Sequence, residues 1–580
     1  MSGPVKKSEA TSVASLPERL LTLIVRLGGA ISTLLILIAL ALTTYSVFMR
    51  YVIGHPPVWI DQLVGYILVA LVMFGVAEAY RRGNHIAIDL LTGNLSGRMD
   101  RLRQIWSDLC VFHVRLNRDR KLDPAIAASG RWLAVGAVCD CAPLWSHLSG
   151  DGQMTAVLIF AGLILMLLTG APIFAALGLT ATAILLIFEG GVGSVADTVF
   201  AHLNKPILTT IPLFVFMAQV MIRAKVIDDL YEMAHTLIGH IRGGLGVATV
   251  MACTIFAAIS GSSVATALSI GSSAIPQMQR FGYPRKEALG VVAAGGTLGI
   301  LIPPSGPMIL YAIVSEASIG ALFLAGIIPG ILLALLFAAY SMFSAARRGD
   351  KSPPYAGAAR ILRALRKSIW AVMAPPVVMG GIYLGIFTAA EAAAAGSIYA
   401  LFVAVLAYRN FGLRDLWECA YESMRTSMMV FMIIAGAAMF GHAITIIRLP
   451  VGVTEMVSQM GLGPLGFMVI VMAMIFVMGM FFESIAIILI TTPILLPTMI
   501  ALDIDLVWYG VLLMINLELA MITPPVGMNL FVIKGITDAP LSEVVRGAFP
   551  YVLLMILGLF MLLMVPGLAT WLPYSAGFGR

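Results

Sequence analysis

From Met154 to its end, the chain is almost continuously apolar, and this run constrains the fold more than any other feature. Of its 580 residues, 60% are hydrophobic and only 11% are charged, against about 25% charged in an average soluble domain. Soluble folds keep charged residues on their surface, so a soluble enzyme, a disordered chain and a secreted disulfide scaffold are excluded. The composition predicts a membrane protein with many helical crossings of about 20 residues each. The net charge of +6 is typical of basic cytoplasmic loops rather than of nucleic-acid binding.

Two apolar segments precede this run, at about residues 27–49 and 62–80, and each is long enough to cross a bilayer. Basic residues lie before the first segment and after the second, which predicts that both outer ends face the cytoplasm. Between Arg98 and Lys121 there are seven basic residues, and the apolar pieces nearby are too short for convincing crossings. This polar stretch predicts the boundary of a small front module.

In the rear module, several apolar segments are too short to cross a bilayer as helices and are interrupted by glycine, serine and proline. Irregular backbone is tolerated at membrane depth only where protein or a cavity covers it, so we expect re-entrant hairpins and broken helices. A basic stretch divides this module in two. The predicted divisions are 1–111 (small front module), 112–153 (divergent linker), 154–346 (first rear half), 347–368 (cytoplasmic linker) and 369–580 (second rear half).

The two rear halves resemble each other when the sequence is shifted by about 221 residues. A shift of 220 places Gly246 on Gly466, so one extra residue is expected in the second half, between 476 and 497. The matching residues are mostly prolines and glycines, which control the backbone and survive when a fold is duplicated. The pairs at a shift of 221 are Pro276 with Pro497, Pro303-Pro304 with Pro524-Pro525, Gly306 with Gly527, and Pro329 with Pro550.

Each half therefore contains a similar cassette, in which a short hairpin is followed by a helix that runs into a Pro-Pro break. The hairpin tips are Ser260–Ser263 in the first half and Gly479–Ser484 in the second. Proline frees carbonyls one turn earlier, and glycine lets the backbone approach a ligand. Freed carbonyls and hydroxyls suit a small hard cation, and helix N-termini suit an anion. Paired interruptions in two halves predict the central site of a transporter.

These cassettes resemble the large membrane (M) subunit of tripartite ATP-independent periplasmic (TRAP) transporters, over residues 154–575. The front module resembles the small (Q) subunit of the same family, so the chain is similar to a fusion of both. Residues 112–152 are too polar for the third and fourth helices of such a small subunit. The motifs that carry the resemblance are Leu168–Ile173, Ser260–Thr266, Gly295–Gly306 and Ile522–Phe531 for the large subunit, with Arg50-Tyr51, Trp59–Asp61 and Arg82–Asp89 for the small one.

The resemblance implies an all-α polytopic protein of the bacterial inner membrane that works as an elevator-type secondary transporter. The small module and outer helices would form a scaffold, and the cassettes would form a moving transport domain. Na⁺ would drive the uptake of an organic acid, which a separate periplasmic binding protein delivers. No enzymatic activity, nucleotide, cofactor, nucleic acid or transition metal is expected.

Carried over residue by residue, the resemblance implies two cation sites with a substrate between them. Carboxylates within a membrane are costly, which also favours a functional role for Glu483. Glu518 lies with Asn516 on the second broken helix, and a structural pair with a basic residue is its alternative role. The expected Na⁺ ligands are Ser260, Gly261, Ser262, Ser263, Gly295, Gly296, Thr297 and Gly299 at the first site, and Glu483, Thr523 and Gly527 at the second. The expected substrate-binding residues are Ser262, Ser263, Pro304, Thr523, Pro525 and Asn529.

Several alternatives stay open. The serine-rich tip also suits close helix packing, and the paired prolines also suit a simple helix kink. A nucleotide-driven pump is disfavoured because there is no G-x-x-x-x-G-K-[ST] motif, and a membrane-embedded hydrolase because H-E-x-x-H and G-x-S-x-G are absent. A channel is disfavoured because two different tips suit a closed, alternating site better. The main alternative is a Na⁺/dicarboxylate symporter or oxyanion permease of similar hairpin architecture that needs no binding protein.

Overall fold

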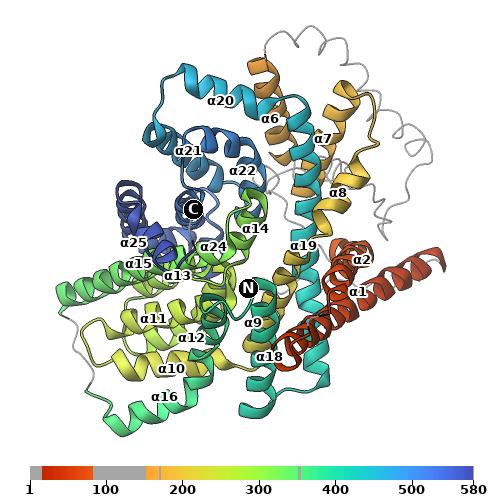
Figure 1. Cartoon of the computed structure of the whole chain (residues 1–580). Helices are drawn as coiled ribbons and strands as arrows, with labels where there is room; N and C mark the ends of the chain where they lie inside the picture. Colours follow the sequence, from red (N-terminus) through yellow and green to blue (C-terminus); the bar gives the residue numbers. More distant parts are fainter. Residues whose placement is uncertain (1–15, 56, 82–151, 169–170, 350–353, 579–580) are drawn as a thin grey trace, which may run out of the picture.

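The computed structural model describes residues 16–55, 57–81, 152–168, 171–349 and 354–578, and this part of the chain is built from helices without a β-strand (Figure 1). Nine of the described helical stretches are long and apolar enough to cross a membrane. The prediction of an all-α polytopic membrane protein is therefore confirmed.

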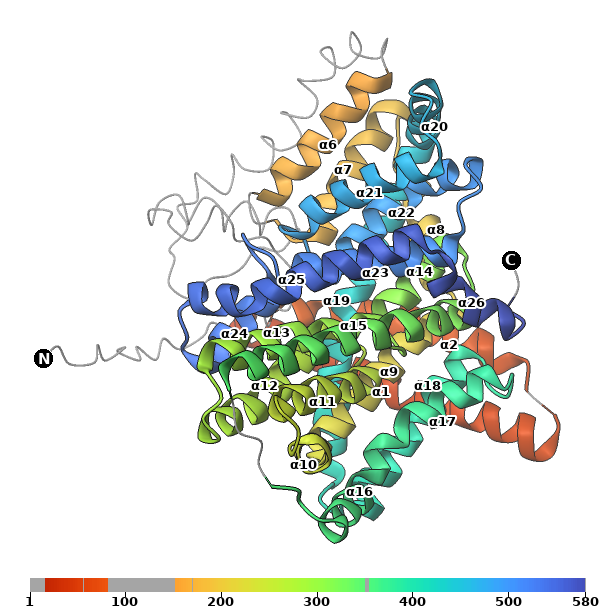
Figure 2. The ribbon, with the colours of Figure 1, turned by 90° about the vertical axis from the view of Figure 1, so that its left-hand side faces the viewer.

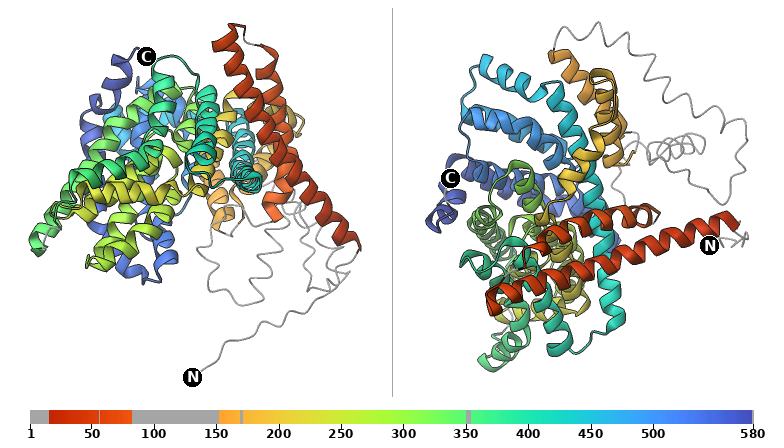
Figure 3. Two further views of the ribbon diagram at one scale, coloured as in Figure 1. Left: turned by 90° about the horizontal axis from the view of Figure 1, so that it is seen from below. Right: turned by 45° about the vertical axis from the view of Figure 1, so that its right-hand side comes forward.

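The front module contributes two antiparallel helices, α1 (Leu16–Phe48) and α2 (Trp59–Arg81), joined through the short helix η1 (Met49–Ile53). They cover both predicted front segments. The helices touch closely: the Ser32 hydroxyl donates to the Leu71 carbonyl at 2.8 Å, and a Cβ on Gly28 would lie 2.6 Å from the Phe74 carbonyl oxygen. Figure 3 shows this pair along one flank of the molecule. Residues 112–151, which the sequence analysis finds too polar for the third and fourth helices of a small subunit, fall outside the described residues.

The first rear half contains two outer helices, a connecting segment and a cassette. Its elements are α6 (Gly152–Leu168), α7 (Ile173–Phe188), α8 (Val195–Leu203), η2 (Pro206–Thr209), α9 (Thr210–Arg223), α10 (Val226–Ile238), α11 (Gly244–Ser260), α12 (Ser263–Arg280), α13 (Arg285–Leu301), α14 (Gly306–Ser315) and α15 (Ile319–Arg348). The hairpin of this cassette is α11 with α12, and α13 with α14 is its broken helix.

The second rear half repeats this order. Its elements are α16 (Ala358–Val372), α17 (Ala374–Tyr383), α18 (Ala389–Phe402), η3 (Val403–Ala407), α19 (Leu413–Ile446), α20 (Leu449–Gln459), α21 (Pro464–Gly479), α22 (Ser484–Ala501), α23 (Leu506–Met521), α24 (Met528–Thr537), α25 (Leu541–Met564) and α26 (Gly567–Ser575). Here α21 with α22 is the hairpin, and α23 with α24 is the broken helix.

Backbone detail supports the duplication. The hairpin connection has two residues in the first half (261–262) and four in the second (480–483). Since α21 ends one residue before the position that matches Ser260 at a shift of 220, one extra residue remains, and it lies in the tip. Non-helical, left-handed residues also recur at matching helix ends, before α10 and α20, after α12 and α22, and after α14 and α24. These pairs are Lys225 with Arg448, Gly282 with Asp503, and Glu316 with Asp538.

The two broken helices form the centre of the rear module. Every residue of α13 from Ala288 to Leu301 is buried, as is every residue of α23 from Val507 to Met521. A helix that is apolar all round belongs in the interior. In Figure 2, α13, α15 and α25 run alongside one another at this centre. The two Pro-Pro breaks thus lie at the C-terminal ends of the two most buried helices.

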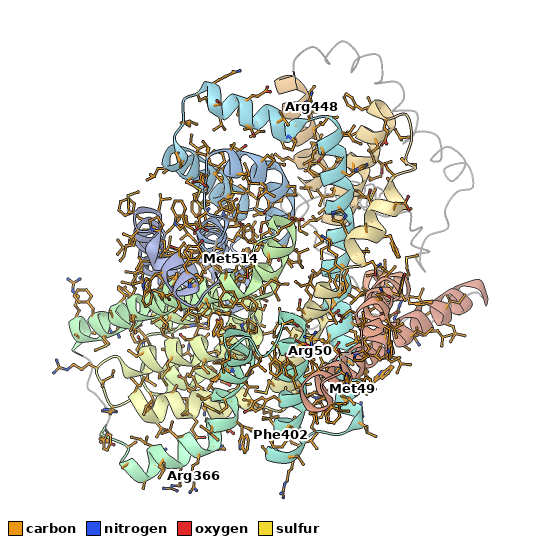
Figure 4. All side chains as sticks on the ribbon, viewed as in Figure 1. Met49, Arg50, Arg366, Phe402, Arg448 and Met514 are labelled. Carbon is orange, nitrogen blue, oxygen red and sulfur yellow. The ribbon has the colours of Figure 1, made fainter. Side chains whose placement is uncertain are left out.

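The front module is fastened to the rear module by polar contacts. Arg50, which is labelled in Figure 4, forms an ion pair with Glu391 of α18 at 2.8 Å. Glu391 also closes a capping box with Thr388 at the start of that helix. Tyr421 of α19 donates to buried Glu78 of α2 at 2.6 Å. These contacts give Glu391 a structural partner and make α18 and α19 the supports of the front module.

A second polar cluster joins α10 to the start of the second half. Lys367 of α16 lies 2.6 Å from Asp229, which also accepts from Tyr408 at 2.8 Å. The hydrogen bond to Asp229 raises the pKa of Lys367, so this ammonium stays charged at physiological pH. The predicted linker 347–368 is helical from Ala358 onwards and is attached to α10. Arg366 lies on the outer side of α16 (Figure 4).

Candidate functional site

The first hairpin tip is a compact turn lined by hydroxyl groups. Gly261 takes a left-handed conformation with φ of 59°, and Ser262 is extended and caps α12 by accepting from the Ala265 N–H at 3.4 Å. The hydroxyls of Ser260 and Thr266 lie 2.9 Å apart, and Thr266 donates to the Ser262 carbonyl at 2.8 Å. Hydroxyl and carbonyl oxygens therefore gather within one turn of the tip.

This tip rests directly on the first broken helix. A Cβ on Gly261 would lie 2.5 Å from the carbonyl oxygen of Pro304, and a Cβ on Gly299 would lie 2.6 Å from the carbonyl of Ser262. Real Cβ atoms do not approach so closely, so both positions require glycine. The structure therefore brings Gly261, Ser262, Gly299 and Pro304 together.

The next turn of α13 meets the second half of the chain. A Cβ on Gly296 would lie 2.8 Å from the Ala267 Cβ and 3.3 Å from the amide nitrogen of Asn529. Asn529, at the start of α24, is fully buried, and both polar atoms of its side chain have no hydrogen-bond partner among the described residues. Gly296 and Asn529, expected at the cation and substrate sites respectively, are thus neighbours across the two halves.

Two other α13 residues point elsewhere. A Cβ on Gly295 would lie 2.6 Å from the Cys253 sulfur on α11, and the Thr297 hydroxyl donates to the Ala294 carbonyl of its own helix at 2.6 Å. The same hydroxyl lies 3.6 Å from the Met555 sulfur on α25. The side chain of Thr297 is therefore not brought to the first tip, although its backbone belongs to the same segment.

The second hairpin tip is longer and chemically different. Glu483 caps α22, where its carboxylate accepts from the Ile485 N–H at 2.8 Å. A Cβ on Gly479 would lie 2.6 Å from the Ala520 Cβ, and the Ser484 hydroxyl lies 3.6 Å from the Met521 sulfur. The second tip therefore rests on the end of α23, just before the break, and Glu483 has a structural role there besides the predicted cation binding.

The second break is more open than the first. Pro303 and Pro304 are buried, whereas Pro524 and Pro525 are exposed. Both Pro-Pro peptide bonds are cis. The Thr523 hydroxyl donates to the Leu519 carbonyl at 2.7 Å, and left-handed Gly527, with φ of 51°, begins α24. Thr523, Gly527 and Asn529 thus lie on one short segment beside the exposed prolines.

One contact between the two halves involves Glu518, which was not among the site residues predicted from the sequence. Ser263 of the first tip donates a hydrogen bond to Oε1 of Glu518 on α23, and both residues are 1% exposed. Asn516, two residues earlier, donates to the Met472 carbonyl at 2.7 Å. The sequence signal for Glu518 was an acid on an otherwise apolar broken helix. In the described residues the side-chain partner of Glu518 is a serine and not the basic residue that its alternative, structural role would require.

The donor set at this centre consists of oxygen atoms. It includes serine hydroxyls, the carbonyls of Ser262 and Pro304, and the Glu518 carboxylate. The described ranges contain no group of three or more His, Cys, Asp or Glu side chains that could hold a metal ion. Such oxygen donors suit a hard cation such as Na⁺. The half-helices α12, α14, α22 and α24 also begin at the tips and breaks, and helix N-termini favour anions.

A duplicated helical membrane protein with two broken-helix cassettes around a buried polar centre has the architecture of a membrane transporter. Residues 160–568 match the family described as "Tripartite ATP-independent periplasmic transporter, DctM component", and residues 39–116 match "Tripartite ATP-independent periplasmic transporters, DctQ component". The chain therefore belongs to the TRAP transporter family and joins its small and large membrane components. It is a multi-pass inner-membrane protein.

Curated relatives agree with this assignment. The chain is 38% identical to the C4-dicarboxylate TRAP transporter large permease protein DctM of Pseudomonas aeruginosa, over 69% of this chain and 94% of the relative. It is 32% identical to the sialic acid large permease SiaM of Vibrio cholerae, over 72% and 98%. It is 34% identical to the isethionate permease DctMQ of Oleidesulfovibrio alaskensis, over 71% of this chain and 65% of that protein.

Proposed function

We propose that this protein imports an organic acid by Na⁺-coupled symport, receiving the substrate from a periplasmic binding protein. The observation that carries the proposal is the meeting of both halves at one buried oxygen-rich centre, where Ser263 of the first tip contacts Glu518 of the second broken helix. A site built from two duplicated halves can open alternately to the two sides when one part moves against the other.

Sodium as the coupling ion is supported by the oxygen donors at the two hairpin tips and the two Pro-Pro breaks. The first proposed site uses the Ser260–Ser263 tip with the backbone of Gly295–Gly299, and the second uses the second tip with the Thr523–Gly527 break. Both sites offer hydroxyl and carbonyl oxygens next to broken helices. Each Na⁺ that crosses with the substrate contributes about 2.3 kcal/mol per 100 mV of membrane potential, if its charge is not balanced.

An organic anion as substrate is supported by helix N-termini and by the names of relatives. The α14 N-terminus is capped by Ser305, next to Pro304, and the α24 N-terminus begins beside Gly527. The relatives are named for C4-dicarboxylate, isethionate and sialic acid, which are all organic acids. We place the substrate between the two cation sites, near Ser262, Ser263, Pro304, Thr523, Pro525 and Asn529.

An elevator movement is proposed because the helices divide into two groups. The front helices α1 and α2 pack on α18 and α19. The helices of the two cassettes, α11–α15 and α21–α25, instead pack together, with α13 and α23 buried among the others. We propose that the second group moves against the first and carries the central site with it.

The test is uptake of a radiolabelled organic acid into proteoliposomes that contain the whole purified chain. We expect uptake only when both an inward Na⁺ gradient and the cognate periplasmic binding protein are present. Equal uptake without the binding protein would instead support the symporter that needs no binding protein. Uptake that is unchanged when Na⁺ is replaced by K⁺ would contradict Na⁺ coupling.

A further inference from the structure

Helix α16 touches the rest of the protein along one narrow side. Its buried residues are Ser368 and Ala371, and the helix it packs on is α10. The Ser368 hydroxyl donates to the Asp229 carbonyl at 2.8 Å, and Lys367 forms its ion pair with the carboxylate of the same residue. The attachment to α10 therefore occupies one side of α16 and leaves most of its remaining surface exposed in the described part of the chain.

An apolar strip lies on the exposed surface of α16. Leu362 is 60% exposed, and Leu365 and Ile369, each on the next turn, are 38% and 41% exposed. At the same four-residue spacing the strip continues through Met373 and Val377 into α17, which packs on the membrane helix α18 (Figure 2). From Leu365 to Val377 a helix rises about 18 Å, close to the depth of one leaflet, which is half of about 30 Å. The strip thus has the position and the length of a lipid-facing surface.

Arginines without a counter-charge lie beside this strip. Arg363 and Arg366 are three residues apart and exposed, and neither forms an ion pair within the described residues. One turn after Arg366, Trp370 packs on Phe402 of α18, with their ring centroids 5.7 Å apart. Residues 351–390 contain five basic residues and no acid. Two free guanidinium groups and an indole therefore lie at one border of the apolar strip.

An exposed arginine is well solvated in water, so the two arginines alone would need no ligand. The apolar strip changes this, because water is a poor environment for it and because it continues into a helix of the membrane domain. Arginine and tryptophan side chains with one apolar part and one polar end are typical of the membrane interface. A guanidinium group also matches the geometry of a phosphate with two parallel hydrogen bonds. These features together favour a lipid with an anionic headgroup over a soluble partner.

We propose that α16 is an interfacial helix that binds an anionic phospholipid of the cytoplasmic leaflet. Arg363 and Arg366 hold its phosphate, and its acyl chains lie along the apolar strip. The sequence analysis places this linker on the cytoplasmic side, where basic residues are favoured. Because Ser368 and Lys367 join α16 to α10, which leads into the first cassette, the bound lipid holds the start of that cassette at the membrane surface. This inference goes beyond the proposed function, and lipid binding does not require transport.

The test is lipid binding to the purified, delipidated whole chain, measured by native mass spectrometry in detergent. Phosphatidylglycerol and phosphatidylcholine with the same acyl chains are added in separate series, and we expect phosphatidylglycerol to bind more tightly. Arg363→Gln combined with Arg366→Gln should weaken this binding about thirtyfold and leave phosphatidylcholine unaffected. Arg414→Gln is the matched control, since this exposed arginine of α19 is already paired with Glu418 at 3.0 Å, and it should bind as the wild type does.

Several outcomes would overturn the proposal. These are equal affinity of the wild type for both lipids, wild-type affinity of the double glutamine variant, and binding of inorganic phosphate as tight as that of the lipid. A dimer that the added lipid does not dissociate would show that a second copy covers the strip. Arg363→Lys with Arg366→Lys should recover part of the affinity, because the charge is kept. If the double glutamine variant does not fold, Leu362→Gln replaces it and should weaken binding of both lipids; unchanged binding would again contradict the proposal.

Discussion

The two hairpin tips occupy equivalent places in a duplicated fold, yet they differ in chemistry. The first tip is a two-residue connection lined by serines, and it presses on α13 and a buried Pro-Pro break. The second is a four-residue connection with two phenylalanines and Glu483, beside an exposed break. Duplication has thus retained the backbone breaks while the side chains around them diverged. A single asymmetric substrate, with cations on either side, suits such an asymmetric pair.

Packing at the tips shows the same division. At the first tip, Gly299 allows the backbone of Ser262 to lie against α13. At the matching position 221 residues later, α23 has Ala520, and the second tip supplies the glycine, Gly479. Close approach is kept in both halves, but the residue that permits it has moved from the broken helix to the hairpin.

The largest expected effect comes from filling the closest approach. Gly299→Ala places a Cβ 2.6 Å from the Ser262 carbonyl and should displace the first tip. Overpacking of this kind costs about 1–3 kcal/mol, which predicts a loss of uptake of about tenfold or more. Gly380→Ala in α17, away from the proposed site, is the control, because its Cβ would meet nothing within 4 Å. Wild-type uptake by Gly299→Ala in proteoliposomes would show that the first tip does not need this contact.

The next effect concerns the hydroxyls that distinguish the first tip. Ser262→Ala combined with Ser263→Ala removes two oxygen donors, and hydrogen bonds or contacts to charged groups are worth about 1.5–3 kcal/mol each. We expect the Na⁺ concentration for half-maximal uptake to rise by about tenfold or more. Ser272→Ala is the control on the same helix, where an exposed hydroxyl away from the tip donates to the Ser269 carbonyl at 2.9 Å, and it should leave Na⁺ activation nearly unchanged. Unchanged Na⁺ activation in the double variant would exclude the first tip as a cation site.

The smallest expected effect is at the second break. Thr523→Val keeps the shape of the side chain but removes a hydroxyl whose net hydrogen bond is worth about 0.5–1.5 kcal/mol, so uptake should fall severalfold. Thr491→Val removes the same kind of bond, from a hydroxyl to the carbonyl four residues earlier, at a buried position within α22. Its uptake should match the wild type. Equal kinetics for both variants would assign Thr523 a structural role only.

Much of this centre could be predicted from the sequence because its backbone breaks are made by proline and glycine, whose conformational limits are local. The breaks at Pro303-Pro304 and Pro524-Pro525 were predicted in this way, whereas the extra residue of the second half was placed only between 476 and 497. Helix ends formed without proline were harder to see: the chain turns after Ser315, between α14 and α15. The local sign of this turn is the polar stretch Ser315–Ser318, in which Ser318 caps α15.

Side-chain direction and contacts between the halves could not be predicted. The Thr297 hydroxyl turns towards Met555 because its helix is packed against α25 on that face. The bond between Ser263 and Glu518 joins residues 255 positions apart, and only the packing of both halves around α13 brings them together. The assignment of Na⁺ ligands and substrate residues stays a prediction.

The central claim is that each half contributes one cation site to a shared substrate site. Its most direct test is the Na⁺ dependence of uptake in proteoliposomes with the cognate binding protein, measured for the wild type, the Ser262→Ala and Ser263→Ala double variant, and Thr523→Val. The account predicts a cooperative Na⁺ dependence in the wild type and lower cooperativity after a change in either half. Cooperativity that persists unchanged in both variants would contradict it.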